Sequence, residues 1–322
     1  MTEEPPEMNG NAITTRGLTK QFGDEFAVRD LTLSVPTGKI FGFIGPSGCG
    51  KTTTVRLMTG IYKPTAGEVQ VLGFDPLRFT EKIRRKLGYM PQLFSLYPEM
   101  TVSENLNFAA SMYGLGLFRR KRLKKMLAFV ELSEHGHKLV RDLSGGMIRR
   151  LSLATTLIHE PQLIFLDEPT TGSDPILRRK FWDYFKTLRD MGRTLVVTTQ
   201  YVGEAAHCDY VGVLAAGRLF IVDTPQGLRS RAFGGEIVDL RSSGHVDFAT
   251  LQSLQDLPFI TGSVTRLDPS RVRIVVKEAS TAIPDLTEWA HQHKIPIQSV
   301  EPYLPPYDDV FVELLKDEDS SG

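Results

Sequence analysis

The sequence predicts an α/β domain with a mostly parallel sheet, followed by a small α+β domain. Strand-like and helix-like segments alternate through the first two thirds of the chain, which is typical of parallel sheets connected by helices. A glycine-rich loop at residues 45–53 joins an apolar run to a helix-like segment. Residues 234–322 carry fifteen acidic and seven basic residues, whereas the chain of 322 residues is neutral. The preceding part therefore has eight excess positive charges, and the two parts are expected to differ in role.

The composition is that of a folded protein, with 41% apolar residues. No stretch reaches the roughly 18 consecutive apolar residues that cross a bilayer, and the start, MTEEPPEMNG, is unlike a secretion signal. Two cysteines, Cys49 and Cys208, are too few for a disulfide framework and suit a reducing compartment. We expect a cytoplasmic protein without a membrane span. The sequence lacks the basic stripe of nucleic-acid-binding proteins, so no nucleic-acid partner is expected.

The first predicted elements are two strands. After residues 1–11, which we expect to be flexible, apolar alternation in ITTRGLTKQF and AVRDLTLSV predicts strands that a turn at Gly23 and Asp24 separates. A β-rich edge is therefore expected before the glycine-rich loop.

The loop itself, GPSGCGKTT, fits the phosphate-binding pattern G-x-x-x-x-G-K-[ST] between a strand and the helix-like TTTVRLMTG. Backbone N–H groups and the helix N-terminus would bind a polyphosphate, and Lys51 would place its ammonium near the β- and γ-phosphates. The candidate nucleotide-binding residues here are Gly45, Pro46, Ser47, Gly48, Cys49, Gly50, Lys51, Thr52 and Thr53.

Helical patterns dominate the next segment, and we place an inserted helical subdomain at about residues 93–161. TVSENLNFAASMYG begins with Thr101 three residues before Glu104, a capping box. RRLSLATTLIHEP adds a second apolar periodic run. The basic segment FRRKRLKKM at 118–126 is compatible with a solvated helix surface or with contact to lipid headgroups or a partner.

Strand patterns return at LIFLDE, TLVVTTQ and YVGVLAAGRLFIV, with a helix over PILRRKFWDYFKTLRDMG that ends at Gly192. These elements complete a first domain at residues 12–228. Beyond it, EIVDLRSS, RVRIVVKE and IPIQSVEPY read as strands, and DFATLQSLQ and TAIPDLTEWAHQH as helices. They predict a small α+β accessory or regulatory domain at 229–316, followed by a frayed tail at 317–322.

Four motifs together resemble the ATPase subunit of ABC transporters. They are GPSGCGKTT, LSGGM at 143–147, LIFLDEP at 163–169 and TTQ at 198–200. LSGGM placed twenty residues before LIFLDEP distinguishes this class from other P-loop NTPases. The resemblance covers residues 12–229 and implies an ABC-type P-loop NTPase core that binds ATP and Mg²⁺.

The resemblance also implies roles for single residues. Thr52, Gln92 and Asp167 would bind Mg²⁺, and Glu168 would polarise the attacking water as a general base. Gln92 would also sense the γ-phosphate, which makes it a catalytic candidate.

Two further roles concern the nucleotide. Phe22 would stack on adenine, with core packing in the edge sheet as the alternative. Gln200 would contact the γ-phosphate as a third catalytic residue.

Other motifs imply a second ATPase domain. Ser144, Gly145 and Gly146 stand at a helix start, where their N–H groups would bind the γ-phosphate of the opposite subunit, and Asp174 would lie at that subunit boundary. Because the chain has one copy of each motif, it needs a partner domain, and a homodimer is the simplest expectation.

The resemblance further implies an integral membrane permease as a partner, docked near residues 92–104, where Phe94 and Tyr97 are either anchors or core residues. LSGGM, TTQY and PPYDDVFVELL are similar to daunorubicin-type exporter ATPases. This branch implies export of a drug, a lipid or another amphipathic compound from the cytoplasmic face of the membrane.

Two positions depart from the usual family pattern. Met147 stands where glutamine is common, and Gln200 stands where histidine is common; an amide cannot carry a proton near neutral pH as imidazole can. A hydrolysis-impaired, regulatory subunit of a heterodimer therefore remains an alternative. A non-transport ABC ATPase acting on ribosomes or DNA is another, although such proteins commonly contain two ATPase domains or a long coiled coil.

Overall fold

The computed structural model describes residues 10–93, 95–116 and 118–319. The chain divides between Val222 and Asp223 into two compact units, residues 1–222 and 223–322. The predicted boundary after residue 228 falls inside helix α7 (Pro225–Phe233). This helix begins at the Thr224 cap and packs against α10 (Tyr307–Asp319), so it belongs to the second unit.

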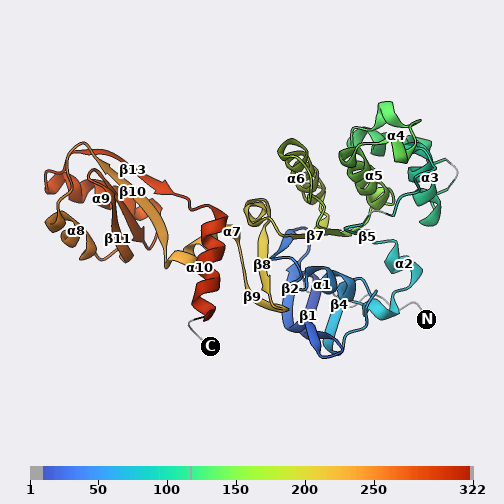
Figure 1. Cartoon of the computed structure of the whole chain (residues 1–322), viewed down its shortest axis with the longest axis horizontal. Helices are drawn as coiled ribbons and strands as arrows, with labels where there is room; N and C mark the ends of the chain where they lie inside the picture. The colour runs from blue at the N-terminus through green and yellow to red at the C-terminus, as the bar shows by residue number, and fades with distance from the viewer. Residues whose placement is uncertain (1–9, 94, 117, 320–322) are drawn as a thin grey trace. The chain divides into compact units, whose positions relative to one another are not determined.

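A central sheet forms the middle of the first unit, and its strand order within the described residues is β5-β6-β7-β3-β8-β9 (Figure 1). The pairs that join β5, β6, β7, β3 and β8 are parallel. β3, β6 and β7 are buried along their whole length, as expected for a sheet covered on both faces. The strands are β3 (Ile40–Ile44), β5 (Leu87–Met90), β6 (Leu163–Asp167), β7 (Thr194–Thr199), β8 (Tyr210–Ala215) and β9 (Arg218–Asp223).

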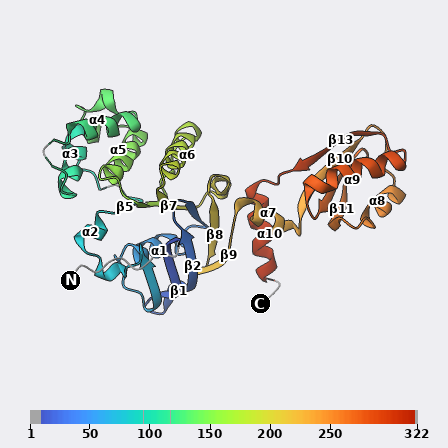
Figure 2. The same ribbon diagram turned by 180° about the vertical axis from the view of Figure 1, so that it is seen from behind.

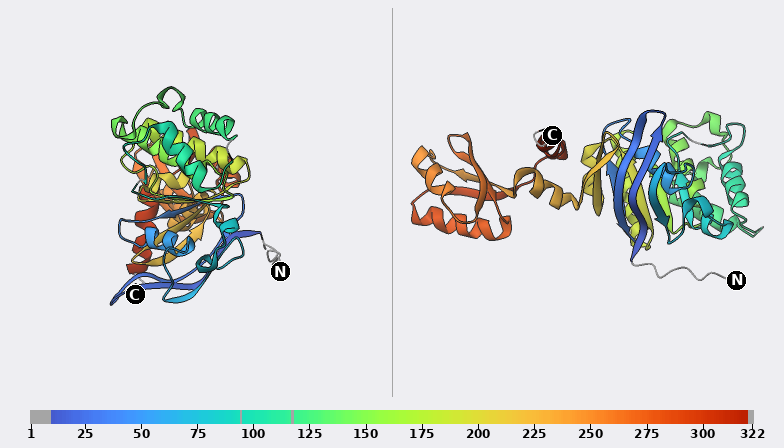
Figure 3. Two further views of the ribbon diagram at one scale, coloured as in Figure 1. Left: turned by 90° about the vertical axis from the view of Figure 1, so that its right-hand side faces the viewer. Right: turned by 90° about the horizontal axis from the view of Figure 1, so that it is seen from below.

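A second, antiparallel sheet contains β1 (Asn11–Phe22), β2 (Glu25–Pro36) and β4 (Ala66–Val71) in the order β2-β1-β4. Helix α1 (Lys51–Met58) lies between this sheet and the central sheet, as Figure 1 shows and the edge-on view in Figure 3 confirms. Short helices η1 (Pro76–Arg78) and α2 (Glu81–Arg84) follow β4. The predicted β-rich edge is therefore present.

The predicted helical insert lies between β5 and β6. It contains α3 (Val102–Met112), α4 (Arg120–Phe129) and α5 (Gly145–Leu157), with short turns η2 (Ser133–His135) and η3 (Val140–Asp142). Leu106, Val130 and Leu151 are fully buried in its own core. The Thr101 hydroxyl accepts from the Glu104 N–H, and the Glu104 carboxylate accepts from the Thr101 N–H, so the predicted capping box is confirmed.

Helix α6 (Pro175–Asp190) covers the face of the central sheet opposite α1 (Figure 1). Pro175 occupies its first turn, and the Asp174 carboxylate accepts from the N–H groups of Ile176 and Leu177. Gly192, two residues past its end, has φ 81°, which explains why the helix stops there. A short helix, η4 (Val202–His207), follows β7.

The second unit is an antiparallel sheet in the order β11-β12-β10-β13, with α8 and α9 beside it (Figure 2). Val238, Leu240 and Ile274 point into the core with α8 and α9. Strand β11 was not predicted, and α10 extends to Asp319, past the predicted start of a frayed tail at residue 317. The elements are β10 (Glu236–Ser242), α8 (Phe248–Gln255), β11 (Ile260–Asp268), β12 (Arg271–Val276), α9 (Ala279–Gln292) and β13 (Ile297–Tyr303).

Candidate nucleotide-binding and hydrolysis site

The glycine-rich loop connects β3 directly to the N-terminus of α1. A Cβ on Gly45 would lie 2.0 Å from the Leu214 carbonyl oxygen, and a Cβ on Gly50, where φ is 103°, would lie 2.2 Å from the Ala27 carbonyl oxygen. Only glycine fits these two positions. Pro46, Ser47 and Gly48 are exposed along the loop, whereas Cys49 is buried, which raises the pKa of its thiol.

Lys51 begins α1 and turns back across the loop. Its Nζ donates to the carbonyl oxygens of Gly45 (2.8 Å) and Pro46 (2.9 Å). Thr52 and Thr53 follow it in the first turn and are half-buried. The residues predicted to bind phosphate thus form one loop with a cation held across it and the positive end of a helix at its base.

Asp167 ends β6 and pairs in register with Thr198 of β7. The hydroxyls of Thr52 (3.0 Å) and Thr198 (2.6 Å) both donate to Asp167 Oδ1. Its other oxygen, Oδ2, is buried and has no hydrogen-bond partner among the residues described. Burial raises the pKa of Asp167, although the hydrogen bonds from Thr198 and Thr52 act in the opposite direction.

A Mg²⁺ ion fits this chemistry. The unpaired Asp167 oxygen and the Thr52 hydroxyl are oxygen ligands of the kind that Mg²⁺ prefers. No group of three or more His, Cys, Asp or Glu side chains suited to a metal occurs in the part of the chain that the structure describes. An ion here would therefore take further ligands from phosphate oxygens and water, as Mg²⁺ usually does.

Glu168 lies beside Asp167 and is fixed from several sides. Gln92 Nε2 (2.9 Å) and Thr171 Oγ1 (3.2 Å) both donate to Glu168 Oε2. Lys51 Nζ lies 3.8 Å from Glu168 Oε1. Three predicted site residues that lie far apart in the sequence therefore meet in one cluster, in which Lys51 and Glu168 are buried and Gln92 is exposed. Gln92 contacts Glu168 rather than Asp167.

The backbone of Glu168 is strained, with φ 49°. A non-glycine residue in this region costs about 1–3 kcal/mol. The Glu168 N–H donates to both the hydroxyl (2.9 Å) and the carbonyl oxygen (3.1 Å) of Thr198, which holds this conformation. In this backbone conformation the Glu168 carboxylate contacts Gln92 and Lys51.

Ser144, Gly145 and Gly146 begin α5, and the Ser144 hydroxyl accepts from the Met147 N–H (3.3 Å). Ser144 and Gly145 are exposed, and a Cβ on Gly145 would meet no atom within 4 Å. Across the described ranges, no hydrogen bond or ion pair joins these residues or Asp174 to the loop at 45–53. The structure therefore brings them to helix starts but not to the phosphate loop of the same chain.

Phe22 and Gln200 lie at the margins of the site. Phe22, at the end of β1, is 46% exposed, so the alternative of core packing is wrong. Its ring meets Tyr62 edge to face, with centroids 5.4 Å apart, and Lys20 Nζ lies 4.8 Å from its centroid. Gln200 follows β7 and is exposed.

Sequence reasoning missed several residues that hold the site. Thr198 links Asp167 and Glu168, although it lies within the TTQ motif that drew attention to Gln200. Buried Glu204 accepts from Thr170 Oγ1 (2.7 Å), just past Glu168. Arg149, four residues into α5, donates to the Pro169 carbonyl oxygen (3.0 Å). The available signal for Thr198 was its place near the end of a buried strand that neighbours the strand of Asp167.

Comparison with known proteins decides the family. A family model described as "ABC transporter" matches residues 28–171. A daunorubicin resistance ATP-binding protein, DrrA3 of Streptomyces coeruleorubidus, is 36% identical over 97% of this chain and 98% of its own. The chain belongs to the ABC transporter family. A probable multidrug ABC transporter ATP-binding protein of Escherichia coli, YbhF, is 40% identical over 70% of this ABC protein, which spans only 39% of YbhF's length.

Solved structures agree with this membership. A dimeric ATP-binding cassette in a post-hydrolysis state, bound to ADP and Pi, matches with a TM-score of 0.62 and 28% identity over 66% of this ABC protein and 98% of that chain. The predicted family and fold are therefore confirmed, and the prediction of an ATPase agrees with both. Among the described residues, no helix has the length and apolar character needed to span a bilayer.

Proposed function

We propose that this ABC protein hydrolyses MgATP as a dimer and powers a separate membrane permease that exports a drug, a lipid or another amphipathic compound. The observation that carries the proposal is the Glu168 carboxylate held by Gln92 beside Lys51 and adjacent to Asp167. The names of the relatives support the direction and the cargo class, since they include daunorubicin resistance, linearmycin resistance and Nod factor export ATP-binding proteins.

Each residue of the cluster has a role that its chemistry suits. The loop N–H groups and Lys51 would bind the phosphates, and Thr52 and Asp167 would hold Mg²⁺, which neutralises charge on the phosphates during transfer. Glu168 would accept a proton from the attacking water. Gln92 orients that carboxylate, and because it lies between β5 and the helical insert, it would relay hydrolysis to the insert.

The dimer would complete the site. The exposed start of α5, with Ser144, Gly145 and Gly146, offers free N–H groups and the positive end of a helix. We place it against the γ-phosphate bound by a second copy, with Asp174 at the boundary between the copies. Phe22 would stack on adenine and Gln200 would donate a hydrogen bond to the γ-phosphate.

A groove between the helical insert and α2 is the proposed docking site for the permease. Its cavity has about 490 Å³ and includes Tyr97, Phe108 and Met112 in its lining. Tyr97 is 48% exposed and meets Phe108 edge to face, which makes it a candidate anchor. Buried Asn105 bonds both the N–H (2.8 Å) and the carbonyl oxygen (3.0 Å) of Tyr97, so its backbone is fixed. The other predicted anchor, Phe94, lies outside the described residues.

This docking would hold the protein at the cytoplasmic face of the membrane. A helix that projects from the permease into the cytoplasm would insert its apolar face into the groove. Copurification with a polytopic membrane protein that Tyr97→Ala reduces would support the assignment. Recovery of the parent protein only in assemblies without a membrane protein would contradict it.

The direct test of activity is phosphate release from MgATP by the purified protein, compared with Lys51→Ala and Glu168→Gln. We expect turnover that rises more than linearly with protein concentration and is lost in both variants, with Glu168→Gln accumulating as an ATP-bound dimer. Measurable phosphate release at the same rate by all three proteins would contradict the proposal. ATP binding with no measurable turnover in any of the three would instead favour the hydrolysis-impaired subunit of a heterodimer.

Complementation tests the shared site. A Cβ at Gly145 would meet no atom within 4 Å, and a carboxylate suits a helix N-terminus, so Gly145→Asp should fold. It would repel the γ-phosphate of the second copy. We expect Lys51→Ala and Gly145→Asp each to be inactive, and their mixture to recover turnover, because the mixed dimer contains one intact site. A mixture that stays inactive while the mixed dimer forms would contradict the shared site.

A further inference from the structure

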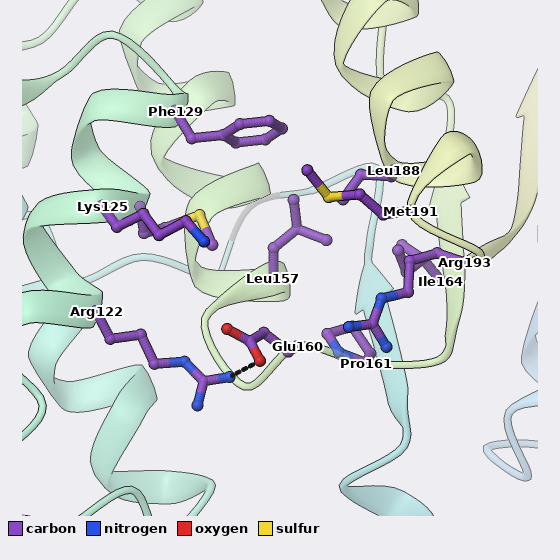
Figure 4. Close-up of a pocket in the computed structure, with 11 residues that line it drawn as sticks. Arg122, Lys125, Phe129, Leu157, Glu160, Pro161, Ile164, Leu188, Met191 and Arg193 are labelled. Carbon is purple, nitrogen blue, oxygen red and sulfur yellow. Dashed lines mark ion pairs between the residues drawn. The ribbon is translucent and has the colours of Figure 1, made fainter.

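A separate cavity of about 330 Å³ lies in the first unit, between α4, the end of α5 and the end of α6 (Figure 4). Its walls come from the helical insert on one side and from the central sheet and α6 on the other. None of the residues assigned to the nucleotide site lines it within the described ranges. The lining residues are Arg122, Lys125, Met126, Phe129, Leu157, Glu160, Pro161, Ile164, Leu188, Met191 and Arg193.

The inner surface of the cavity is apolar. Leu157 (2% exposed), Ile164 (0%) and Leu188 (9%) form buried walls, and Phe129 closes one side in Figure 4. Burial of apolar ligand surface against such walls contributes about 25 cal/mol per Å². The volume stands at the low end of the roughly 300–1,000 Å³ typical of small-molecule sites, so it suits one short acyl chain rather than a two-chain lipid.

The rim carries unbalanced positive charge. Arg122, Lys125 and Arg193 stand against a single carboxylate, Glu160, which pairs with Arg122 at 3.3 Å. Within the part of the chain that the structure describes, Lys125 and Arg193 form no ion pair, and Arg122 Nε is buried without a hydrogen-bond partner. Figure 4 shows Lys125 and Arg193 directed toward the cavity from opposite sides. This arrangement favours a ligand that has an anionic group next to an apolar group.

We propose that this cavity binds a single-chain amphipathic anion, with its tail between Leu157 and Leu188 and its head between Lys125 and Arg193. The chemistry is that of a medium-chain carboxylate or a lipid of the same charge and chain number. Bound there, the ligand bridges α4 of the insert to α6, and so ties the insert to the central sheet. The site is independent of ATP hydrolysis, and its test requires no turnover.

The experiment measures binding of decanoate, below its micelle concentration, to the full-length protein by titration calorimetry. We expect saturable binding that the double variant Lys125→Glu/Arg193→Glu weakens at least about tenfold, since it reverses both head contacts. Lys124→Glu is the matched control, because Lys124 is an exposed residue of α4 that does not line the cavity. Decyltrimethylammonium, with the same chain and opposite charge, should not bind.

A steric variant tests the contribution of the cavity independently of the charges at its rim. Met191 lies at the rim and is 63% exposed, so Met191→Trp should fold normally and obstruct the cavity. We expect it to weaken decanoate binding without changing the charge of the site. The proposal is overturned by absence of saturable decanoate binding, by equal binding of the cationic amphiphile, or by equal weakening in Lys124→Glu.

Flotation with phosphatidylcholine vesicles that contain lysophosphatidylglycerol, an anionic lipid with a single acyl chain, distinguishes two sources of the ligand. Capture that depends on Lys125 and Arg193 but not on Lys124 identifies a bilayer lipid as the source. Decanoate binding without vesicle capture identifies a free amphiphile. Vesicle capture that all three charge reversals reduce equally, without decanoate binding, reflects general attraction to basic α4 and contradicts the cavity site.

Discussion

Asp167 in the first unit and Asp239 in the second are both buried carboxylates, yet they are compensated in opposite ways. Asp167, 1% exposed, receives hydrogen bonds only from neutral threonine hydroxyls and forms no ion pair with any described residue. Asp239, 9% exposed, pairs with Arg271 and with both nitrogens of the Arg273 fork. Burial raises the pKa of Asp167; at Asp239 burial acts in the same direction, but the two arginines outweigh it and lower the pKa.

The way each carboxylate is compensated indicates whether it serves ligand binding or the stability of the fold. A buried carboxylate without a cation is costly, and a protein retains one where a ligand supplies the missing charge. In the second unit, β10 and β12 supply both charges themselves, with Asp239 and Arg273 in register on the face away from α8 and α9. Arg273 also stacks on Tyr303, 3.4 Å from its ring centroid. We therefore propose that Asp239 serves stability and that Asp167 binds Mg²⁺.

The largest effect on stability is expected from Asp239→Asn. The substitution leaves two arginines without their carboxylate, and because these are 25–33% exposed, water offsets part of the loss. We expect the second unit to lose about 2 kcal/mol, while MgATP turnover stays unchanged. Hydrogen exchange of the full-length protein, followed by mass spectrometry over β10 and β12, measures the loss. Unchanged protection in these strands would mean that the ion pairs contribute little.

Thr198→Val tests the hydroxyl that links Asp167 and Glu168. Valine keeps the shape and the backbone carbonyl but removes one hydrogen bond to each residue. We expect phosphate release to fall about tenfold, equivalent to about 1.4 kcal/mol. Thr194→Val is the control, since Thr194 is buried in the same strand and, among the described residues, its hydroxyl bonds only the Gly38 N–H. Equal loss in both variants would attribute the effect to folding rather than to the site.

The sequence could predict the residues of local motifs but not the residues whose partners come from distant segments. The phosphate loop, Asp167, Glu168 and Gln92 were identified because each lies in a short motif whose chemistry can be recognised locally. Thr198, Thr171 and the Asp239 pair were not, because their partners are set by strand register between distant segments. The strained φ of Glu168 depends on bonds to β7 and has no local signature.

The fold was predictable where periodicity was strong and less so where it was weak. The capping box at Thr101 and the helix stop at Gly192 follow from local backbone chemistry. β11 alternates half-buried and exposed residues without a strong apolar signal, so no local pattern separates it from a loop. The division at Val222 precedes α7 because that helix packs against α10, a contact between segments 80 residues apart that no local pattern reveals.

Acid should affect the second unit through Asp239. Its folded pKa is lowered, so its contribution to stability is present above the unfolded value near 3.8 and is lost as pH falls through the folded pKa. We expect Asp239→Asn to show a smaller loss of stability than the parent below about pH 4. The methyl resonance of Ile274, in the core of this unit, reports its unfolding in the full-length protein. Parallel losses in both proteins would show that other groups dominate acid unfolding.

The smallest effect is expected from Gln200→His. A neutral amide and an imidazole can each donate one hydrogen bond to a phosphate, so turnover should change less than about threefold. Steady-state phosphate release between about pH 5 and 8, the range over which imidazole titrates, checks this. A rise of ten times or more, appearing only in the histidine variant, would show that the amide limits hydrolysis in the parent protein.

Asp167→Asn is the most direct test of the assignment of the unpaired carboxylate to Mg²⁺. The variant removes a buried charge that no described residue compensates, so without nucleotide its Tm should stay the same or rise by a few degrees. Its single-turnover hydrolysis of MgATP should fall at least about a hundredfold, whereas Asp239→Asn should lose stability and keep hydrolysis. Asp167→Asn that hydrolyses MgATP at the parent rate, or unfolds at a lower temperature without nucleotide, would contradict the account.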